Sequence, residues 1–266
     1  MKTIPLYILV FFILLSASSC DKVIDLKLGS ETGELVIEGV ITNVKGPQYI
    51  KLTTNVAFSN TNTYPPVTGA QVTVNDQAGH TYTFTESAAG VYSISQLTGT
   101  AASVYTMHVS TNGKNYTASS TMPKQVGLGS ITAAKNSFDS DNNKKKITVH
   151  YSDPKGVVNQ YKFLLYVNGV QVKRVFVNND DFTDGNYVSF DLIQDDIDIY
   201  PGDKVTVEMQ CIDKAVYTYW LTLMQQDYNG PGGGVTPSDP PTNITPQVLG
   251  YFSAQTIQTK SLTVKE

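Results

Sequence analysis

Acidic side chains are the most concentrated chemically active groups in this sequence of 266 residues, and the densest gathering extends from Asp180 to Asp203. Its members are Asp180, Asp181, Asp184, Asp191, Asp195, Asp196, Asp198 and Asp203. Carboxylate oxygens, like the amide oxygens of nearby asparagines, are hard ligands that suit Ca²⁺. Aspartate also collects at the ends of strands because its side chain favours turns. The sequence leaves open whether this region binds calcium.

A smaller acidic run, Asp139–Asn143, superficially resembles a calcium-binding loop. It lacks the glycine that such a loop needs at its sharp turn and the bidentate glutamate that ends it. Three lysines, Lys144–Lys146, follow at once. We therefore predict that this run forms the solvated tip of a hairpin.

Histidines and known catalytic motifs offer no site. His80, His108 and His150 are far apart in the sequence, and none has a metal-ligand partner two or four residues further on. The chain has no His-Glu-x-x-His, no Gly-x-Ser-x-Gly and no phosphate-binding glycine loop. We expect a protein that is not an enzyme, without a cofactor and without catalytic, cofactor-binding or metal-binding residues. A convergent pair of acids within Asp180–Asp203 would be the one route to catalysis.

Cys20 directly follows a short targeting segment. Lys2 supplies a positive charge, residues 6–15 are apolar, and the small residues Ser16–Ser19 precede the cysteine. The apolar run is too short to cross a bilayer, which takes roughly 20 residues. Small residues ahead of a cysteine resemble the lipobox of bacterial lipoproteins, although Ala17 stands where leucine is usual. The resemblance implies cleavage before Cys20 and acylation of its thiol and of the new amino terminus.

The amino-terminal segment is therefore predicted to be a lipoprotein signal peptide over residues 1–19, followed by a lipidated tether over residues 20–33. Three acyl chains, such as palmitate, would anchor the protein stably, because a single chain binds a membrane only marginally. The alternative is an ordinary signal peptide that is cut nearby, with a cysteine there by chance.

Cys211 is the second of the two cysteines. If Cys20 carries lipid, Cys211 has no intramolecular partner, and the fold depends on no disulfide. It lies on the apolar face of the alternating run Val205–Cys211. We therefore predict a buried, inert thiol.

The net charge argues against nucleic acid as a partner. Removing residues 1–19 removes Lys2 and no acid, so the net charge of −4 becomes −5. Nucleic-acid binding needs a basic face, which a mildly acidic chain is poorly placed to supply. The lipid anchor, and not surface charge, is expected to hold the protein on the membrane.

The composition predicts a folded, mainly β body. Hydrophobic residues make up 41% of the chain and charged residues 16%, which suffices for a core. From Glu34 onward, runs of alternating residues recur with turn residues between them, which is typical of a β-sandwich. The length suggests two domains. We place the first sandwich at residues 34–123 and a linker at 124–129.

Residues 130–266 are predicted to form a second β-rich domain that contains one helix. Asn168-Gly169 lies between two strand-like runs, which is a strong hairpin signal. Apolar residues recur at helical spacing near 213–228, with Asp213 as a plausible N-cap. The Gly- and Pro-rich segment 230–243 is expected to be a mobile loop. The predicted fold class is thus two tandem immunoglobulin-like sandwiches, the second with an amphipathic helix.

The first unit resembles a known sandwich module. The resemblance rests on Val36–Ile41, on the step Pro66–Val74, on Gly90–Ile94 and on Tyr105–Val109. These segments are similar to the carboxypeptidase-regulatory-like, transthyretin-like sandwich, which resembles an immunoglobulin domain. The resemblance implies a module that is not itself catalytic.

The mature chain as a whole resembles the domain-of-unknown-function 4249 (DUF4249) lipoproteins of Bacteroidetes-type bacteria. The matching segments are Cys20–Leu26, Pro66–Val74, Thr117–Pro123, Pro201–Val205 with Tyr217–Trp220, and Pro240–Ile244 with Gly250–Phe252. The resemblance implies an outer-membrane lipoprotein, often encoded beside TonB-dependent transporters. It implies no established activity and no known site residues.

Aromatic residues give the remaining binding candidates. Tyr217, Trp220 and Tyr228 lie on the apolar stripe of the expected helix, which favours burial in the core. Tyr64–Pro66 and Asn229–Thr242 are expected in loops, where binding residues concentrate.

We expect a lipid-anchored, non-catalytic binding or accessory module, with a TonB-dependent transporter or another envelope protein as partner. One alternative is direct binding of a glycan or peptide, and another is a structural or adhesive role in the envelope. The sequence leaves open whether the protein faces the periplasm or the exterior.

Overall fold

A computed structural model describes residues 32–57, 60, 63–136, 140–141, 143–226 and 238–266. The described chain is mainly β, with one helix among these residues, and its strands lie in open sheets. None of the helical structure in these ranges combines the length and apolarity needed to cross a bilayer. The predicted signal peptide, Cys20, most of the tether and most of the loop 230–243 lie outside the described residues.

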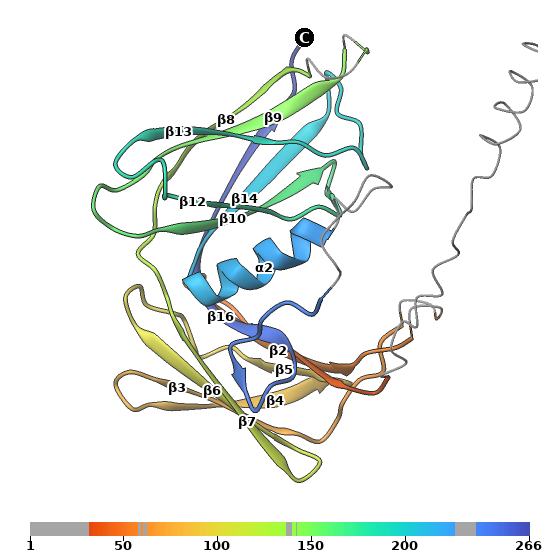
Figure 1. Cartoon of the computed structure of the whole chain (residues 1–266), viewed down its shortest axis with the longest axis vertical. Coiled ribbons are helices and arrows are strands. Elements are labelled where there is room, and N and C mark those ends of the chain that lie inside the picture. Colours follow the sequence, from red (N-terminus) through yellow and green to blue (C-terminus); the bar gives the residue numbers. More distant parts are fainter. Residues whose placement is uncertain (1–31, 58–59, 61–62, 137–139, 142, 227–237) are drawn as a thin grey trace, which may run out of the picture.

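The first seven strands form the lower half of the molecule in Figure 1. They are β1 (Leu35–Thr42), β2 (Gln48–Thr54), β3 (Gln71–Asp76), β4 (Thr81–Ala88), β5 (Val91–Ile94), β6 (Val104–Thr111) and β7 (Lys114–Thr121). Side chains on β1 alternate as the sequence predicts, because Ile37 and Ile41 are fully buried while Val36 and Glu38 are part-exposed. These strands enclose one apolar core, which includes Leu52, Val74 and Met107.

The next group forms the upper half. Its strands are β8 (Leu128–Lys135), β9 (Lys145–Ser152), β10 (Gln160–Val167), β11 (Val170–Gln171), β12 (Phe176–Asn179), β13 (Tyr187–Leu192) and β14 (Lys204–Ile212). The sheet β13–β9–β8 packs against the strands around β10 and β14, and a second apolar core lies between them. Tyr151, Tyr161 and Phe163 are its largest fully buried side chains.

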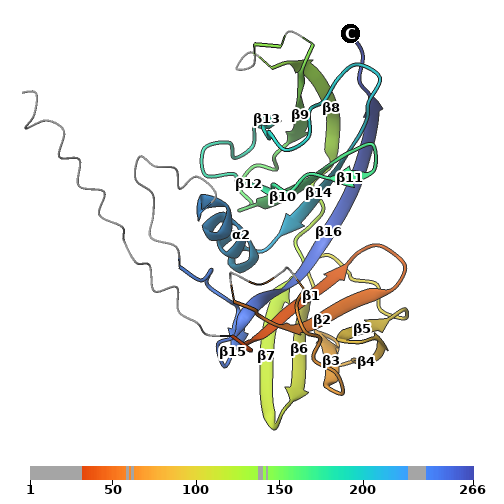
Figure 2. The ribbon, with the colours of Figure 1, turned by 90° about the vertical axis from the view of Figure 1, so that its right-hand side faces the viewer.

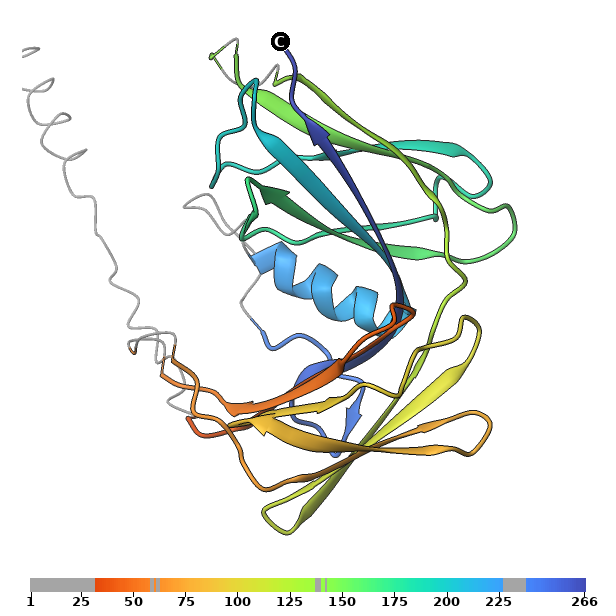
Figure 3. The ribbon, with the colours of Figure 1, turned by 180° about the vertical axis from the view of Figure 1, so that it is seen from behind.

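The last strand, β16 (Leu249–Thr263), joins the two halves. Its first part pairs in parallel with β1, from Leu249 opposite Val36 to Gln255 opposite Thr42. Its second part pairs antiparallel with β14, from Thr256 opposite Cys211 to Thr263 opposite Lys204. Figures 2 and 3 show β16 running in dark blue from the lower strands to the upper ones. One continuous 13-stranded sheet therefore passes through both halves.

The carboxyl-terminal segment thus contributes to both cores. The short strand β15 (Ile244–Thr245) pairs with β7, and Ile244, Phe252 and Ala254 are buried in the first core. Residues 244–255 pack with the strands of residues 34–123, although the sequence groups them with 130–266. Local strand patterning does not specify the partner of a strand, because pairing partners lie far apart in the chain.

Two segments differ locally from the sequence expectation. Strand β8 begins at Leu128, inside the segment 124–129 expected as a linker, and Val126 is buried. A register shift at Gly129 explains the loop-like sequence, because a Cβ atom there would lie 2.9 Å from the carbonyl oxygen of His150. The run expected as one strand after Asn168-Gly169 is divided between β11 and β12.

Helix α2 (Lys214–Gln226) occupies the predicted position. Asp213 caps it, because the backbone N–H of Val216 donates to Asp213 Oδ1 at 3.0 Å. In Figure 1 the helix lies between the upper and lower strands. Val216 is buried, and Tyr217, Tyr219 and Trp220 pack against Ile212 and Tyr251. The aromatic stripe is therefore partly buried, on the side of the helix that faces these residues. Tyr228 lies outside the described residues.

Candidate functional site

Two adjoining hollows lie beside the start of β1 and the segment that leads into β16, and the smaller of them is bordered by helix α2. Asp239, Pro240 and Leu249 line both of them. We refer to the two hollows together as the junction cleft. The strand β1 contributes to both through consecutive residues, Leu35 to one hollow and Val36 to the other, because adjacent side chains on a strand point to opposite sides.

The larger hollow has a volume of about 540 Å³. Its walls come from the start of β1, from the turn between β6 and β7, and from the segment before β16. The residues beyond the three shared ones are Gly33, Glu34, Leu35, Thr111, Asn112, Lys114, Tyr116, Gln247 and Val248. The described chain begins at Thr32, so this hollow lies at the point where the predicted tether enters the folded body.

The smaller hollow has a volume of about 400 Å³ and a more apolar lining. Its walls come from β1, β2, α2 and the start of β16. Its residues are Val36, Glu38, Lys51, Thr53, Tyr64, Tyr219, Leu223 and Gly250, with the three shared ones. Tyr64 is 47% exposed and was a surface candidate in the sequence. Two aromatic rings and one proline therefore border a hollow of ligand size.

Charged groups give the smaller hollow its polarity. Lys51 Nζ and Glu38 Oε2 lie 3.8 Å apart on neighbouring strands, and both side chains are about half exposed. Burial raises the pKa of Tyr219 to about 12, and the negative charges of Glu38 and Asp239 act in the same direction. The Tyr219 hydroxyl is therefore protonated at neutral pH and can donate a hydrogen bond.

A buried lysine lies beneath helix α2. Lys162 is 4% exposed, and its Nζ is 4.6 Å from the ring centroid of Trp220 and 5.9 Å from that of Tyr251. Burial lowers the pKa of Lys162 to about 8, opposed by the charge of Glu208. The rings replace part of the hydration that the ammonium group loses. The sequence analysis did not predict that Lys162, a residue of β10, is buried.

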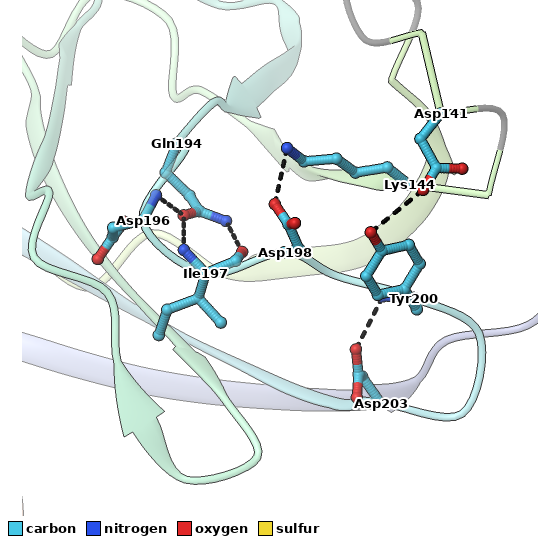
Figure 4. Close-up of polar contacts among 8 residues, drawn as sticks. All are labelled: Asp141, Lys144, Gln194, Asp196, Ile197, Asp198, Tyr200 and Asp203. Carbon is cyan, nitrogen blue, oxygen red and sulfur yellow. Dashed lines mark hydrogen bonds and ion pairs between the residues drawn. The ribbon is translucent and has the colours of Figure 1, made fainter.

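The acidic region Asp180–Asp203 separates into two parts in the structure. Several of its later carboxylates are used in turns and ion pairs, and Figure 4 shows those of Asp198 and Asp203. Asp198 pairs with Lys144 at 2.7 Å, and Asp203 Oδ2 accepts the backbone N–H of Tyr200 at 2.7 Å. That hydrogen bond, with a second one from Asn168, lowers the pKa of Asp203. These acids serve local structure, as their turn preference predicts.

Asp191 and Asp196 are likewise occupied. Burial alone would raise the pKa of Asp191, but hydrogen bonds from Lys146 and Thr148 outweigh it and lower the pKa. Asp196 Oδ2 accepts the backbone N–H of Lys173 at 2.7 Å. In Figure 4, the side chain of Gln194 closes the neighbouring turn by accepting from the backbone of Asp196.

In the other part of the region, Asp180 and Asp184 lie close to Asp153, which is outside the region in the sequence. One oxygen each from Asp153, Asp180 and Asp184 lies within 4.8 Å of the other two. We refer to these three residues as the carboxylate cluster. Asp153 lies about 30 residues before the acidic region, directly after β9. Sequence spacing could not predict that it lies next to Asp180, because the packing of β9 places it there.

The smaller acidic run lies in the turn between β8 and β9, as predicted. Asn136 N–H donates to Lys144 O at 3.0 Å across this turn, and Asp141 Oδ2 accepts the hydroxyl of Tyr200. Asp139 and Asn142 lie outside the described residues. The remaining groups that the sequence singled out are the histidines and Cys211.

The three histidines have separate neighbours. His80 Nδ1 lies 2.8 Å from Asp76 Oδ2, His150 lies between Thr132 and Ser189, and His108 is exposed on β6. Among the described residues, none of them belongs to a group of metal-ligand atoms. Cys211 is buried and free, as predicted.

Comparisons with known proteins give one strong match. Curated proteins provide no match. Among solved structures, the adhesin InvE of Yersinia pseudotuberculosis is 17% identical with a TM-score of 0.19, and the alignment covers 66% of this chain and 55% of that one. A 1.5-MDa bacterial ice-binding adhesin is 15% identical with a TM-score of 0.20, over 87% and 64% of the two chains. The chain thus spans less than two thirds of each, and similarity at this level supports no argument about function.

A family model described as a domain of unknown function (DUF4249) matches residues 21–261. The match covers almost the whole chain after Cys20 and agrees with the mainly β architecture. The protein therefore belongs to the DUF4249 family.

Proposed function

We propose that this protein is a lipid-anchored, non-catalytic binding or accessory module of the cell envelope, with the junction cleft as its binding surface. The observation that carries the proposal is the cleft itself. Residues from β1, β2, α2 and β16, which lie far apart in the sequence, border a hollow with Tyr64, Tyr219 and Pro240 in its walls. Ligand sites characteristically combine such apolar walls with a few polar groups, here those of Glu38 and Lys51.

The position of the cleft supports a role close to the membrane. The larger hollow is lined by Gly33, and the predicted lipid attachment is at Cys20. An extended chain over that interval spans at most about 45 Å. A ligand in the cleft would then be held within that distance of the bilayer, where a TonB-dependent transporter or another envelope protein could receive it.

Direct capture of a glycan or peptide is the second candidate function. Tyr64 favours it, because an aromatic ring that is about half exposed at the edge of a hollow can stack on a sugar ring or pack against a side chain. Tyr219 adds a hydrogen-bond donor.

The description of the body as two immunoglobulin-like sandwiches belongs to the same proposal. Two separate buried cores, one below and one above helix α2, support it. The shared strand β16 makes the two units dependent on each other, so we expect one cooperative unfolding transition and not two.

The anchor is tested with the full-length gene expressed in a bacterium of the Bacteroidetes type. We expect the wild-type protein in the membrane fraction, with a mass that shows acylation of Cys20. The Cys20→Ser variant should leave the membrane fraction. An unmodified Cys20 thiol in the wild type, or a Cys20→Ser variant that stays in the membrane fraction like the wild type, would refute the anchor.

The cleft is tested by photo-cross-linking in the same cells. A photoreactive residue replaces Tyr64 in one strain and Tyr49 in another; the two tyrosines are similarly exposed, at 47% and 50%, but Tyr49 does not line the cleft. We expect a transporter or surface polysaccharide cross-linked at position 64 and absent at position 49. Equal adducts at both positions, or none at either, would refute the cleft as the binding surface.

A further inference from the structure

The carboxylate cluster brings together two segments of the upper half. Asp153 follows β9, while Asp180 and Asp184 lie in the turns that follow β12. Asp153 and Asp180 are each 5% exposed, and Asp184 is exposed. Their side-chain oxygens approach within 4.8 Å of one another, so two buried carboxylates and one at the surface share a small volume.

Backbone groups hold each carboxylate in place. Asn159 N–H donates to Asp180 Oδ2 at 2.7 Å, and Gly156 N–H donates to Asp184 Oδ1 at 2.6 Å. Asp153 accepts the hydroxyl of Tyr161 and the N–H of Gly185. The carboxylates are therefore held by the backbone of the turns around them and, at Asp153, also by the hydroxyl of the buried Tyr161.

The three carboxylates of the cluster form no ion pair with a basic side chain among the described residues. Carboxylates that share a buried site repel one another, and burial in a medium of low dielectric constant adds to the cost. A cation between them would remove both penalties.

Asn159 adds a buried oxygen next to the cluster. It is 4% exposed, its backbone nitrogen lies against Asp180, and its side-chain Oδ1 is buried without a hydrogen-bond partner. Thr183, between Asp180 and Asp184 in the turn, also has a buried and unpartnered side-chain oxygen. Buried polar atoms nearly always have a hydrogen-bond partner. Two buried oxygens without one, on residues next to three carboxylates, therefore point to a cation that these oxygens would coordinate.

The donor set selects the metal. All the available groups are oxygens, from carboxylates, an amide and a hydroxyl, and no sulfur or imidazole nitrogen belongs to the group. Zinc sites in proteins are dominated by Cys and His. Ca²⁺ accepts six to eight oxygens in flexible geometry, whereas Mg²⁺ demands a near-ideal octahedron and retains several waters.

We propose that the carboxylate cluster binds one Ca²⁺ ion, with Asp153, Asp180 and Asp184 as carboxylate ligands and Asn159 Oδ1 as the amide ligand. The ion ties the turn after β9 to the turns after β12. It stabilises the upper half of the molecule and takes no part in the junction cleft, whose residues are different.

The test uses the mature chain carrying Cys20→Ser, treated with a chelator and titrated with CaCl₂. Isothermal titration should show one site with a Kd on the order of 10⁻⁴ to 10⁻³ M, the range of extracellular calcium modules. The melting temperature should rise with CaCl₂ and much less with MgCl₂ at the same concentration. Terbium should bind in its place and emit on tyrosine excitation, because Tyr161 donates to Asp153.

Two variants and one control locate the site. Asp180→Asn should weaken calcium binding at least tenfold, and Asp184→Asn, an exposed position that tolerates substitution, should weaken it as well. Asp195→Asn is the matched control in the same acidic region, exposed and outside the cluster, and should bind like the wild type. No calcium binding by the wild type up to about 10 mM, or unchanged binding by Asp184→Asn, would overturn the proposal.

Discussion

The backbone carbonyl oxygen of Ile37 lies 2.0 Å from the point that a Cβ atom on Gly250 would occupy. The two residues face each other across the parallel pair of β1 and β16, and Gly250 has a φ of +99°. A side chain at this position would separate the strands or force the backbone out of its conformation. The join between the two halves of the molecule therefore requires glycine here.

Substituting Gly250 by alanine should destabilise the protein strongly. Gly202 is a matched control, because its φ of +97° is nearly the same but no atom lies within 4 Å of its Cβ position. Gly202→Ala should cost about 1–2 kcal/mol from the backbone conformation alone. Gly250→Ala should cost several kcal/mol in addition to that, as measured by urea unfolding. Equal losses in the two variants would show that the close approach to Ile37 is not needed.

Replacing the buried Lys162 by methionine should stabilise the protein at neutral pH. Methionine fills a similar volume without a charge, and removing a buried, poorly hydrated charge removes its penalty. A pKa lowered from 10.5 to about 8 means that the charge of Lys162 costs on the order of 3 kcal/mol of folding free energy. The contacts of its ammonium group with the rings of Trp220 and Tyr251 reduce this cost, so the gain in the variant should be smaller. Thermal unfolding at about pH 7 measures the gain, with the exposed Lys204→Met as control.

The same lysine should make stability rise with pH in the wild type. Below pH 8 both the folded and the unfolded chain carry the proton, and the folded state bears the full penalty. Between about pH 8 and pH 10.5 the unfolded chain still holds a proton that the folded chain has released, so the free energy of unfolding increases. Lys162→Met should lose this increase. A variant that retains the wild-type slope would show that another group is responsible.

Local structure was predictable from the sequence, and pairing was not. The alternating run Val205–Cys211 lies within β14, and helix α2 has nearly the predicted limits, because periodicity and caps are local signals. The residues of β16 do not indicate that this strand pairs with both β1 and β14. For the same reason the junction cleft could not be predicted, although Tyr64, one of its residues, was a surface candidate. Asp153 joins Asp180 only through the packing of the upper strands.

The cap of helix α2 should contribute measurably to stability. Asp213 accepts the N–H of Val216 and the hydroxyl of Ser120, which is 3% exposed and in turn accepts the N–H of Ala254 at 2.8 Å. Asp213→Ala removes the cap and leaves the Ser120 hydroxyl without its acceptor, for an expected loss of about 2–4 kcal/mol. Asp213→Asn keeps the cap and should lose less than half of that in urea unfolding. Equal losses would contradict the capping role.

Cys211 should react with thiol reagents only when the upper half of the molecule opens. Its side chain is 1% exposed, its sulfur accepts the N–H of Val126, and burial raises the pKa of the thiol. Because the thiolate is the reactive form, both burial and the raised pKa slow the reaction. In the Cys20→Ser background, a disulfide reagent should label one thiol per chain in denaturant. In native buffer it should label Cys211 at least about 1,000-fold more slowly than the cysteine of a Val158→Cys variant, a position that is 76% exposed. Comparable native rates at the two positions would show that the core around Cys211 is open to solvent.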